Sequence, residues 1–315
     1  MLTFPNSLLE VIMKKNQILA VVVTHNRRSL LSRCIDHLLS QTREPDEILV
    51  VNNASNDGTV EMLQNRSISF ITQENSGSAG GWYSGIRYAL DHDFDAIWLM
   101  DDDGFPDDDA LSLLDAALLP NVVCASSVVV REDLSTEFVF PLPVLDVSGL
   151  PIIWGRKRKI VSMDELRAVA PEGTYPFAHF FNGALVSVNA IRKVGNVDRS
   201  FFMSGDELDY LYRLRKVGNV VSVLDAIHYH PDQSQRPYTP AKVYYFIKNS
   251  LILNTRYLNA VWIRHALTIA VVVVRTASRN SIRAALSLLV GKNAPIFYLA
   301  IIRGLRGKLG KDLNE

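Results

Sequence analysis

The feature that most constrains the fold is a series of apolar, β-branched segments that alternate with helical patterns and end in polar residues. The first is QILAVVVTHNR at residues 17–27, a continuous apolar run typical of a strand buried on both faces. A helical pattern follows Ser29, the expected N-cap, and a second strand pattern at 46–59 ends in a polar loop. Strand, helix and strand patterns then follow at residues 67–75, 79–92 and 95–103. This alternation predicts an α/β fold that is doubly wound around a mostly parallel central sheet.

The polar tails of these strands indicate where a ligand would bind. In doubly wound sheets, ligands bind in the crevice outside the carboxyl ends of the strands. We therefore expect one site to collect four tails, at residues 24–27, 52–59, 75–81 and 101–103. The chain becomes strongly helical in pattern near residue 241, so we expect residues 1–240 to form the α/β domain and residues 241–315 a helical C-terminal region.

Charge and cysteine content narrow the class of protein. The 315 residues carry 33 Lys and Arg against 33 Asp and Glu, and the isoelectric point is about 7.1, so we expect no nucleic-acid partner. Cys34 and Cys124 lie far apart and form no CxxC motif, which argues against a disulfide framework or a zinc site and favours a cytoplasmic location. Lys14 and Lys15 follow the first apolar stretch, which is the wrong order for a signal peptide.

Three consecutive aspartates, Asp101 to Asp103, directly follow a buried apolar run. Carboxylates crowded at a strand end repel one another unless a cation neutralises them, and a hard divalent ion such as Mn²⁺ or Mg²⁺ is the natural candidate. Because alternate residues of an extended segment point the same way, Asp101 and Asp103 are expected to share one ion while Asp102 faces elsewhere. The alternative is a solvated acidic turn that caps the following helix, which suits residues 107–109.

A second motif is the glycine-rich segment NSGSAGGWYSGI at residues 75–86, placed where a loop turns into a helix. Small residues there let backbone amides approach a phosphate or a nucleotide closely. The alternative is that the glycines permit a close crossing of the helix. The segment matches neither GxGxxG after the first strand nor GxxxxGKS/T, so neither a dinucleotide cofactor nor a P-loop hydrolase is supported.

A third group of chemically active residues lies further along the chain. Asp206, Glu207 and Asp209 begin a helical pattern, where the helix dipole favours acidic side chains. A carboxylate at the edge of a crevice can also serve as a general base toward an acceptor hydroxyl. His228 and His230 end a strand and alternate onto the same face, so either is a further metal ligand or a structural histidine. We favour His230 as the ligand.

The C-terminal region is basic and apolar together. Beyond Tyr257 it carries nine Lys or Arg and two acids, Asp312 and Glu315. This composition predicts contact with an anionic membrane surface, and hence a peripheral location at the inner face of the plasma membrane. The alternative is that these helices pack on the α/β domain or form a homo-oligomer interface. The apolar run at 266–274 is too short to span a bilayer by itself.

Several segments, in this order, resemble the signatures of family 2 inverting glycosyltransferases with the GT-A fold, a Rossmann-like α/β architecture. The resemblance covers residues 17 to about 255. It rests on VVVTHNR, VVNNASNDGT, NSGSAGGWYSGI, MDDDG, FNGALVSVNAI, GDELDYLYR and YYFIKNSLI. Within the family, the chain most resembles bacterial galactofuranosyltransferases and the related rhamnosyltransferases of cell-surface polysaccharide assembly.

The resemblance implies a role for each group of residues. Asp101 and Asp103 would bind the metal with His230, and Glu207 would be the base, with Asp206 beside it in the catalytic set. The implied nucleotide-sugar contacts are Thr24, Asn26, Arg27, Asn52, Asn53, Asn75, Gly77, Gly80, Gly81, Trp82, Asp102 and Asp209. Asn52 stands where many members have an aspartate that contacts the base of the nucleotide, which leaves the choice between UDP and dTDP open.

The implied function is inverting transfer of a sugar, with galactofuranose from UDP-galactofuranose as the first candidate, to a glycan or lipid-linked acceptor. Rhamnosyl transfer from dTDP-rhamnose is the alternative within the family. Two hypotheses from other classes stay open. A nucleotidyltransferase also uses strand-end aspartates and a metal, but would show a basic glycine-rich loop after the first strand, where this chain has THNRRSL. The other is a catalytically silent nucleotide-sugar binding module.

Overall fold

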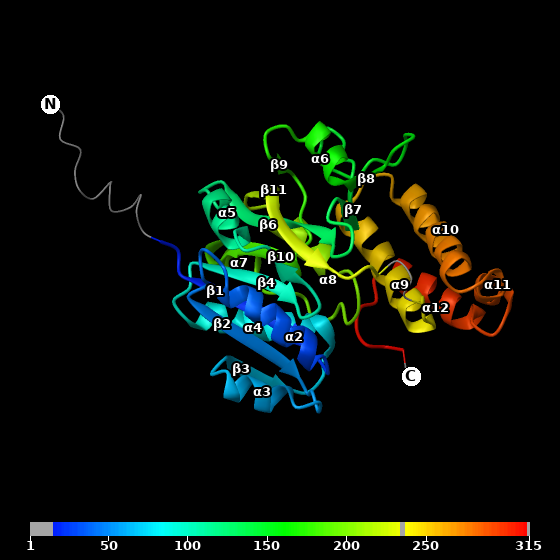
Figure 1. Cartoon of the computed structure of the whole chain (residues 1–315). Coiled ribbons are helices and arrows are strands. Elements are labelled where there is room, and N and C mark those ends of the chain that lie inside the picture. Colours follow the sequence, from blue (N-terminus) through cyan, green and yellow to red (C-terminus); the bar gives the residue numbers. More distant parts are fainter. Residues whose placement is uncertain (1–14, 234–236, 314–315) are drawn as a thin grey trace.

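The computed structural model describes residues 15–233 and 237–313, so most of the N-terminal stretch that bears on a signal peptide lies outside the described residues. An eleven-stranded mixed sheet forms the centre of the molecule (Figure 1). One half of the sheet is parallel and has the strand order β3-β2-β1-β4. These strands are β1 (Ile18–Thr24), β2 (Glu47–Asn53), β3 (Ser69–Gln73) and β4 (Ala96–Asp101). The predicted alternation and mostly apolar strands are confirmed in this half.

The second half of the sheet is mixed. Strand β10 (Asn182–Ser187) runs antiparallel between β4 and β6 (Val122–Arg131), and β11 (Asn219–His230) runs parallel to β6. This arrangement brings the end of β11, which carries both histidines, to the edge where β4 ends. The short strands β5 (Phe105–Pro106) and β9 (Thr174–Tyr175) pair with β11, while β7 (Glu137–Pro143) and β8 (Lys159–Ser162) form an arm that joins the sheet through β6.

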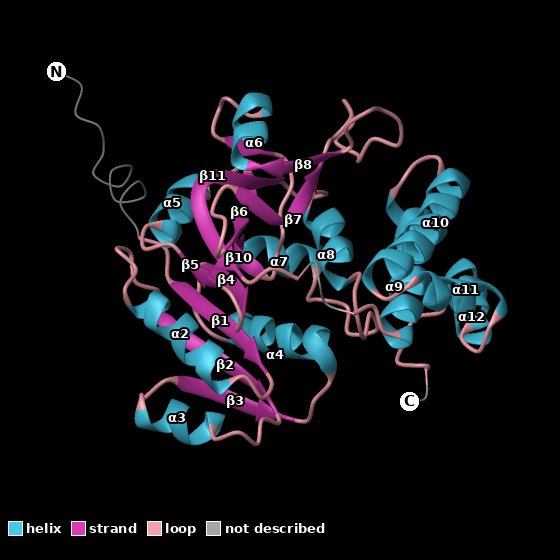
Figure 2. Ribbon diagram, turned by 45° about the vertical axis from the view of Figure 1, so that its right-hand side comes forward, coloured by secondary structure: helices cyan, strands magenta, loops and turns pink. Residues whose placement is uncertain are grey.

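Helices cover both faces of the sheet (Figure 2). The helices of the α/β part are α2 (Arg28–Leu39), α3 (Thr59–Asn65), α4 (Gly77–Asp91), α5 (Ala110–Ala117), α6 (Met163–Val169), α7 (Val188–Val194) and α8 (Asp206–Leu214). One local prediction was wrong and one helix was not predicted. Helix α2 begins at Arg28, so Ser29 lies inside it and does not cap it. The polar loop after β2 also leads into α3, because Gly58 adopts a positive φ of 82° and turns the chain into a helical segment that buries Met62 and Leu63.

The alternation of side chains along β1 explains the two layers of the core. Leu19, Val21 and Val23 face one hydrophobic cluster, which α4 covers. The residues between them face a second cluster on the other side of the sheet, which α2 covers. Every residue of β1 is buried, as expected of a parallel strand with helices on both faces.

Glycines set the distance between α4 and the sheet. A Cβ atom added to Gly85 would lie 2.4 Å from Cγ1 of Val21, and one added to Gly81 would lie 2.5 Å from Cγ1 of Val23. Only hydrogen fits at these two positions without displacing the strand. The sequence left two explanations of this glycine-rich segment, and the structure shows that its glycines do permit a close crossing of the helix over the sheet.

Four helices form the C-terminal part, which lies to one side of the sheet (Figure 1). They are α9 (Pro240–Tyr257), α10 (Val261–Arg279), α11 (Ile282–Val290) and α12 (Ala294–Leu305). They share a hydrophobic cluster of their own, which includes Tyr244, Leu251 and Phe297. The chain beyond α12 returns to α9, where Nζ of Lys248 lies 2.7 Å from Oδ1 of Asp312.

Within the described residues, α10 has the length and composition needed to cross a membrane. Helices α11 and α12 meet the same test only as a pair bent by 60°. The apolar run at 266–274 is thus the middle of a longer helix, so the argument that it is too short for a span does not hold for α10 as a whole.

The glycine contacts of α4 predict a large effect on stability. Gly85→Val should lower the free energy of unfolding by about 2 kcal/mol, because the new methyl groups overpack the contact with Val21. Arg87→Ala, on the exposed side of the same helix, is the control and should change it by less than about 0.5 kcal/mol. Urea unfolding measures both, and equal stabilities for the two variants would contradict this account of the packing.

Candidate active site

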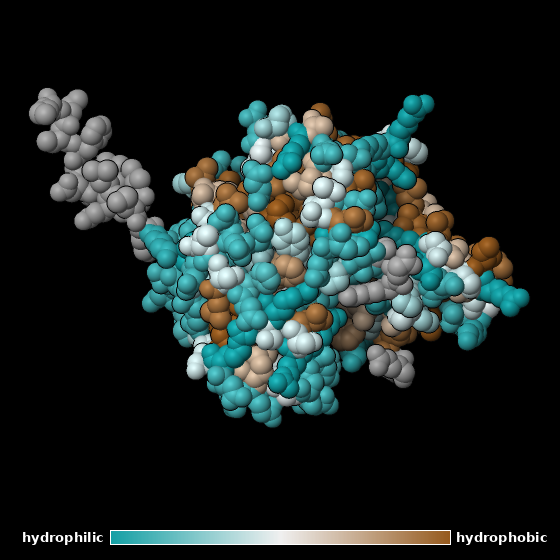
Figure 3. Space-filling model, viewed as in Figure 1, coloured by the Kyte–Doolittle hydropathy of each residue, from teal (hydrophilic) through white to brown (hydrophobic). Residues whose placement is uncertain are grey.

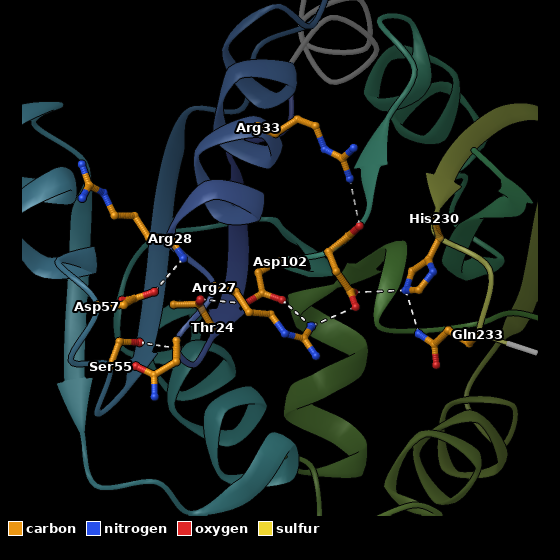
Figure 4. A network of polar contacts seen from close by, with 11 residues as sticks. Thr24, Arg27, Arg28, Arg33, Ser55, Asp57, Asp102, His230 and Gln233 are labelled. Carbon is orange, nitrogen blue, oxygen red and sulfur yellow. Dashed lines mark hydrogen bonds and ion pairs between the residues drawn. The ribbon is translucent and has the colours of Figure 1, made fainter. Parts of the chain in front are cut away.

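The aspartates after β4 are held by a cation from the first loop (Figure 4). Nη1 of Arg27 lies 2.9 Å from Oδ1 of Asp102 and 2.8 Å from Oδ2 of Asp103, and both carboxylates are almost fully buried. The hydroxyl of Thr24 donates to Oδ2 of Asp102 at 2.7 Å. The tails of β1 and β4 therefore meet at the carboxyl edge of the sheet, as the sequence predicted.

The pairing of the aspartates differs from the expectation. Strand β4 ends at Asp101 and a turn follows, so the alternation of side chains does not continue into Asp102 and Asp103. Asp102 therefore does not face away from Asp103; these two share one guanidinium nitrogen. Burial, and then the charges of Asp103 and Asp102, raise the pKa of the Asp101 carboxyl well above its usual value.

The two histidines of β11 have different surroundings. Nε2 of His230 lies 3.1 Å from Oδ1 of Asp103, and its Nδ1 lies 2.7 Å from the carbonyl oxygen of Pro231. His228 is fully buried, and burial lowers its pKa to about 3. It is packed between two glycines: a Cβ atom on Gly104 would lie 2.3 Å from its Nε2, and one on Gly183 would lie 3.1 Å from its Nδ1. Of the two, His230 has the geometry of the candidate ligand.

These groups fit a divalent cation in part. The described residues contain no preassembled group of three or more His, Cys, Asp or Glu side chains that could hold a metal. Asp103 and His230 are nevertheless in contact and offer oxygen and imidazole donors, and a cationic side chain already bridges Asp102 and Asp103. The donor set is therefore suited to a metal ion, provided that Arg27 or Asp101 rearranges.

Glu207 lies in the first turn of α8, near the aspartates. Its Oε1 accepts a hydrogen bond from the backbone N–H of Phe180 at 2.7 Å and lies 3.6 Å from Nδ1 of His179. Its side chain is about one-third exposed, so a ligand can reach it. The hydrogen bond orients the carboxylate, as a base at the edge of a crevice requires.

The neighbouring acids have other environments. Asp206 is buried, and burial followed by the charge of Glu207 raises its pKa to about 7. Asp209, which was expected to contact the nucleotide sugar, already has protein partners in this structure. It is buried one turn further along the helix, where Nε of Arg213 and the hydroxyl of Tyr257 both lie 2.7 Å from its carboxylate. Its role in this structure is to join α8 to α9.

The expected nucleotide-contacting residues of the first two loops lie together. Asn26 has a positive φ of 53°, and its side-chain oxygen accepts a hydrogen bond from the backbone N–H of Asn56 at 2.8 Å. A pocket of about 610 Å³ opens beside Asn26 and Arg27. Asn52 and Asn53 are buried at the end of β2, where Asn52 holds the backbone of the next turn and Asn53 accepts a hydrogen bond from Gln73.

The glycine-rich segment divides into two parts. At its start, Oδ1 of Asn75 accepts a hydrogen bond from the N–H of Gly77, and the φ of +77° at Gly77 requires glycine there. Gly80, Gly81 and Trp82, which were expected to contact the nucleotide, are buried in the helix. The Trp82 ring stacks on Phe181 at 4.4 Å within the core, because the helix turns that face toward the sheet.

The chain is similar to proteins of known function. Residues 19–168 match the family model described as glycosyl transferase family 2. The chain is 34% identical over 223 residues to galactofuranosyltransferase GlfT1 of Mycobacterium tuberculosis, covering 68% of this chain and 70% of that protein. This chain belongs to glycosyltransferase family 2.

Solved structures place the fold of this family 2 enzyme among the GT-A glycosyltransferases. GalNAc-T7, solved with UDP, GalNAc and Mn²⁺, superimposes with a TM-score of 0.57 at 15% identity over 79% of this chain and 49% of that chain. The mannosyltransferase PcManGT of Pyrobaculum calidifontis, solved with GDP-Man and Mn²⁺, gives a TM-score of 0.53 at 16% identity over 93% and 86%. The chain is a nucleotide-sugar glycosyltransferase.

The structure adds residues to the site of this glycosyltransferase that the sequence did not indicate. His179 lies between Glu207 and the ring of Phe140, whose centroid is 5.5 Å from it. Phe140 also contacts His230, with ring centroids 5.4 Å apart. Neither residue follows a recognisable motif, and Phe140 comes from the arm beside the sheet. The only sequence signal concerns His179, which lies two residues before the family segment FNGALVSVNAI.

The position of Arg27 predicts competition with a metal ion. Arg27→Gln should bind Mn²⁺ in the absence of donor roughly three- to tenfold more tightly, because a unit positive charge within about 3 Å of two carboxylates is removed. Arg28→Gln is the matched control, since Arg28 pairs with neither carboxylate and should leave Mn²⁺ affinity unchanged. Electron paramagnetic resonance of free Mn²⁺ measures both. Unchanged or weaker binding by Arg27→Gln would show that its guanidinium does not compete for the site.

Proposed function

We propose that this enzyme is an inverting, metal-dependent galactofuranosyltransferase that uses UDP-galactofuranose and acts on a glycan or lipid-linked acceptor in cell-surface polysaccharide synthesis. The donor is inferred from the 34% identity to galactofuranosyltransferase GlfT1. The single structural observation that carries the reaction type is the oriented carboxylate of Glu207 at the same sheet edge as Asp103 and His230.

The proposed reaction is a single in-line displacement. An acceptor hydroxyl oxygen attacks the anomeric carbon as the bond from that carbon to the diphosphate oxygen breaks, and the configuration inverts. Glu207 takes the hydroxyl proton, and its hydrogen bond from Phe180 keeps the accepting carboxylate in place. Positioning of donor and acceptor supplies much of the acceleration, since well-oriented reactants gain roughly 7–11 kcal/mol.

The donor diphosphate is proposed to bind beside the aspartates. Asp103 and His230, with Asp101 after rearrangement, would hold Mn²⁺ or Mg²⁺, and that ion supplies compensation for the charge that develops on the departing nucleoside diphosphate. Arg27 of the β1–α2 loop, which pairs with Asp102 and Asp103 in this structure, would be the cation nearest to a diphosphate bound there. The pocket beside Asn26 offers room for the nucleoside.

The donor is tested directly. Calorimetric titration with UDP and with dTDP, each with and without Mn²⁺, should give Mn²⁺-dependent binding that is tighter for UDP. Incubation with UDP-galactofuranose and an acceptor glycan should then release UDP. Tighter binding of dTDP, together with release of dTDP from dTDP-rhamnose, would replace this proposal with rhamnosyl transfer, and binding of neither nucleotide would leave a silent binding module.

The base is tested by Glu207→Gln. This change keeps the shape of the side chain and its acceptor oxygen for Phe180 but removes the proton acceptor, so the transfer rate should fall by roughly 10²–10⁴-fold. Mn²⁺-dependent UDP affinity should stay within about twofold of wild type, because the loss is confined to proton transfer. Wild-type turnover by this variant would rule out Glu207 as the base.

The C-terminal helices favour an acceptor that is bound to a membrane, because they expose many large apolar side chains. On α10 the buried face carries Arg264, His265 and Thr276 beside the apolar Val272, whereas Trp262 and Val274 are 76% and 66% exposed. A helix on the surface of a water-soluble domain usually turns its charged side chains toward the solvent, whereas α10 buries Arg264 and exposes large apolar side chains. Helices α11 and α12 bury apolar residues but also expose large ones, namely Ile282, Leu286, Val290, Tyr298, Ile302 and Leu305.

The charged residues in the segment that carries these exposed apolar side chains are all basic. No Asp or Glu occurs between residues 258 and 311, a segment that carries nine Lys or Arg. Apolar surface is visible along the right-hand side of the molecule, over these helices (Figure 3). We infer that this surface, the outer face of α10 to α12, rests on an anionic membrane, with each nearby cation contributing about 1 kcal/mol.

Membrane contact is tested without disturbing the helix bundle. The double variant Trp262→Ser and Val274→Ser should reduce co-sedimentation with phosphatidylglycerol-containing vesicles by roughly tenfold, because two exposed apolar side chains no longer enter the lipid. The matched control is Leu119→Ser with Val169→Ser, which removes two comparably exposed side chains from the α/β part and should bind as wild type does. Equal losses in both variants would contradict docking through this face.

A further inference from the structure

A large groove lies beside the candidate active site, between the β7–β8 arm and helices α9 and α10. Its volume is about 660 Å³. Apolar atoms of Phe246, Leu267 and Val271 form its helical side, and Pro141 and Pro143 of β7 form the opposite side. None of the residues expected from the sequence to bind the nucleotide sugar or the metal lines it, so it is a separate site from that of the donor.

The rim of the groove is strongly cationic. Six basic residues line it and no acidic residue does; they are Arg156, Lys157, Arg158, Lys159, Arg264 and Arg275. Lys157 pairs with Glu165, and Arg264 donates to the backbone of Pro151. Among the described residues, no ion pair joins Arg156, Arg158, Lys159 or Arg275 to a carboxylate. The rim therefore has a surplus of positive charge.

This surplus affects the cations themselves. Partial burial lowers the pKa of Lys159, and the charges of Arg275 and Arg158 lower it further. Arg275 lies over the ring of Phe246, with its guanidinium carbon 5.5 Å from the ring centroid, so this charge sits directly at the apolar wall. An anion bound here would relieve the repulsion between the three cations, and a phosphate matches the fork geometry of the arginines.

The apolar side of the groove leads toward the surface that we infer to meet the membrane. Val271 belongs to both: it lines the groove, and it is 39% exposed on the outer face of α10. A hydrocarbon chain that leaves the groove past Val271 would pass directly onto that face. A cationic rim above an apolar channel is complementary to a molecule with a phosphate head and a hydrocarbon tail.

The other side of the groove borders the candidate active site. Successive residues of a strand point to opposite faces, so Pro141 and Pro143 face the groove while Phe140 faces His179 and His230. One strand, β7, separates the two sites. A sugar attached to a phosphate in the groove would therefore need to pass only the edge of this strand to approach Glu207.

We propose that this groove binds the lipid phosphate or diphosphate that carries the acceptor sugar, with Lys159, Arg158 and Arg275 holding the phosphate and Phe246, Leu267 and Val271 holding the first part of the hydrocarbon chain. The proposal rests on the proposed function, of which it specifies the acceptor. It assigns the β7–β8 arm to acceptor recognition and leaves donor recognition to the loops around Arg27.

The experiment is calorimetric titration of the full chain with farnesyl diphosphate below its critical micelle concentration, without nucleotide sugar and without vesicles. Lys159→Gln combined with Arg275→Gln should weaken binding at least about tenfold, since two charge-assisted contacts are lost. The matched control is Arg192→Gln with Lys193→Gln, two exposed cations at the end of α7, which should bind as wild type does. Equal affinities of the groove variant and wild type would overturn the proposal.

Further titrations distinguish the contribution of the hydrocarbon chain from that of the phosphate. Wild type should bind inorganic pyrophosphate at least about tenfold more weakly than farnesyl diphosphate, because the apolar wall adds to the affinity. Val271→Asp keeps every rim cation and should lose most of this difference. Equal binding of pyrophosphate and farnesyl diphosphate by wild type would exclude a lipid ligand, and displacement of farnesyl diphosphate by dihexanoylphosphatidylglycerol at equal concentration would exclude an acceptor-specific site. None of these titrations contains a sugar donor. Their results therefore stay valid even if UDP-galactofuranose is not the donor.

Discussion

The ion pairs of Arg27 with Asp102 and Asp103 are the interaction on which the candidate site depends. Two nearly buried carboxylates next to a third, Asp101, would repel one another strongly, and the guanidinium from the β1–α2 loop balances them. This pairing fixes the loop after β1 against the end of β4 and places Asp103 beside His230 of β11. Polar contacts thus join β1, β4 and β11 at one edge of the sheet, while the apolar layers on both sides of the sheet set the positions of these strands.

The strands of the parallel half could be predicted because burial on both faces demands continuous β-branched runs, as in β1. The direction of the Asp102 side chain could not be predicted, because side chains alternate only while a segment stays extended, and β4 ends at Asp101. Trp82 and Asp209 were assigned to the site because they stand within family segments. The structure gives both packing roles, since a helix presents only one face to the crevice. His179 and Phe140 lay beyond prediction because contacts between distant segments leave no local pattern.

The α/β part and the C-terminal helices differ in which side chains they bury and which they expose. In the α/β part, charged groups at the sheet edge are buried and need partners, as Arg27 and Thr24 show for Asp102. In the C-terminal helices, polar groups such as Arg264 turn inward while Trp262 and Val274 turn outward. The groove lined by Lys159, Arg275 and Phe246 lies between these two environments. A reaction between a water-soluble donor and a lipid-anchored acceptor requires such a boundary within one molecule.

The packing of His228 between Gly104 and Gly183 has a consequence for the substitutions that this chain can tolerate. Neither glycine offers a side chain to a ligand, yet any Cβ at position 104 would press on the imidazole two residues before His230. A substitution there would move the end of β11 and alter the contact between His230 and Asp103. In a screen of variants by activity, substitutions of Gly104 would therefore be as harmful as those of catalytic residues, although Gly104 contributes only the space that the imidazole of His228 occupies.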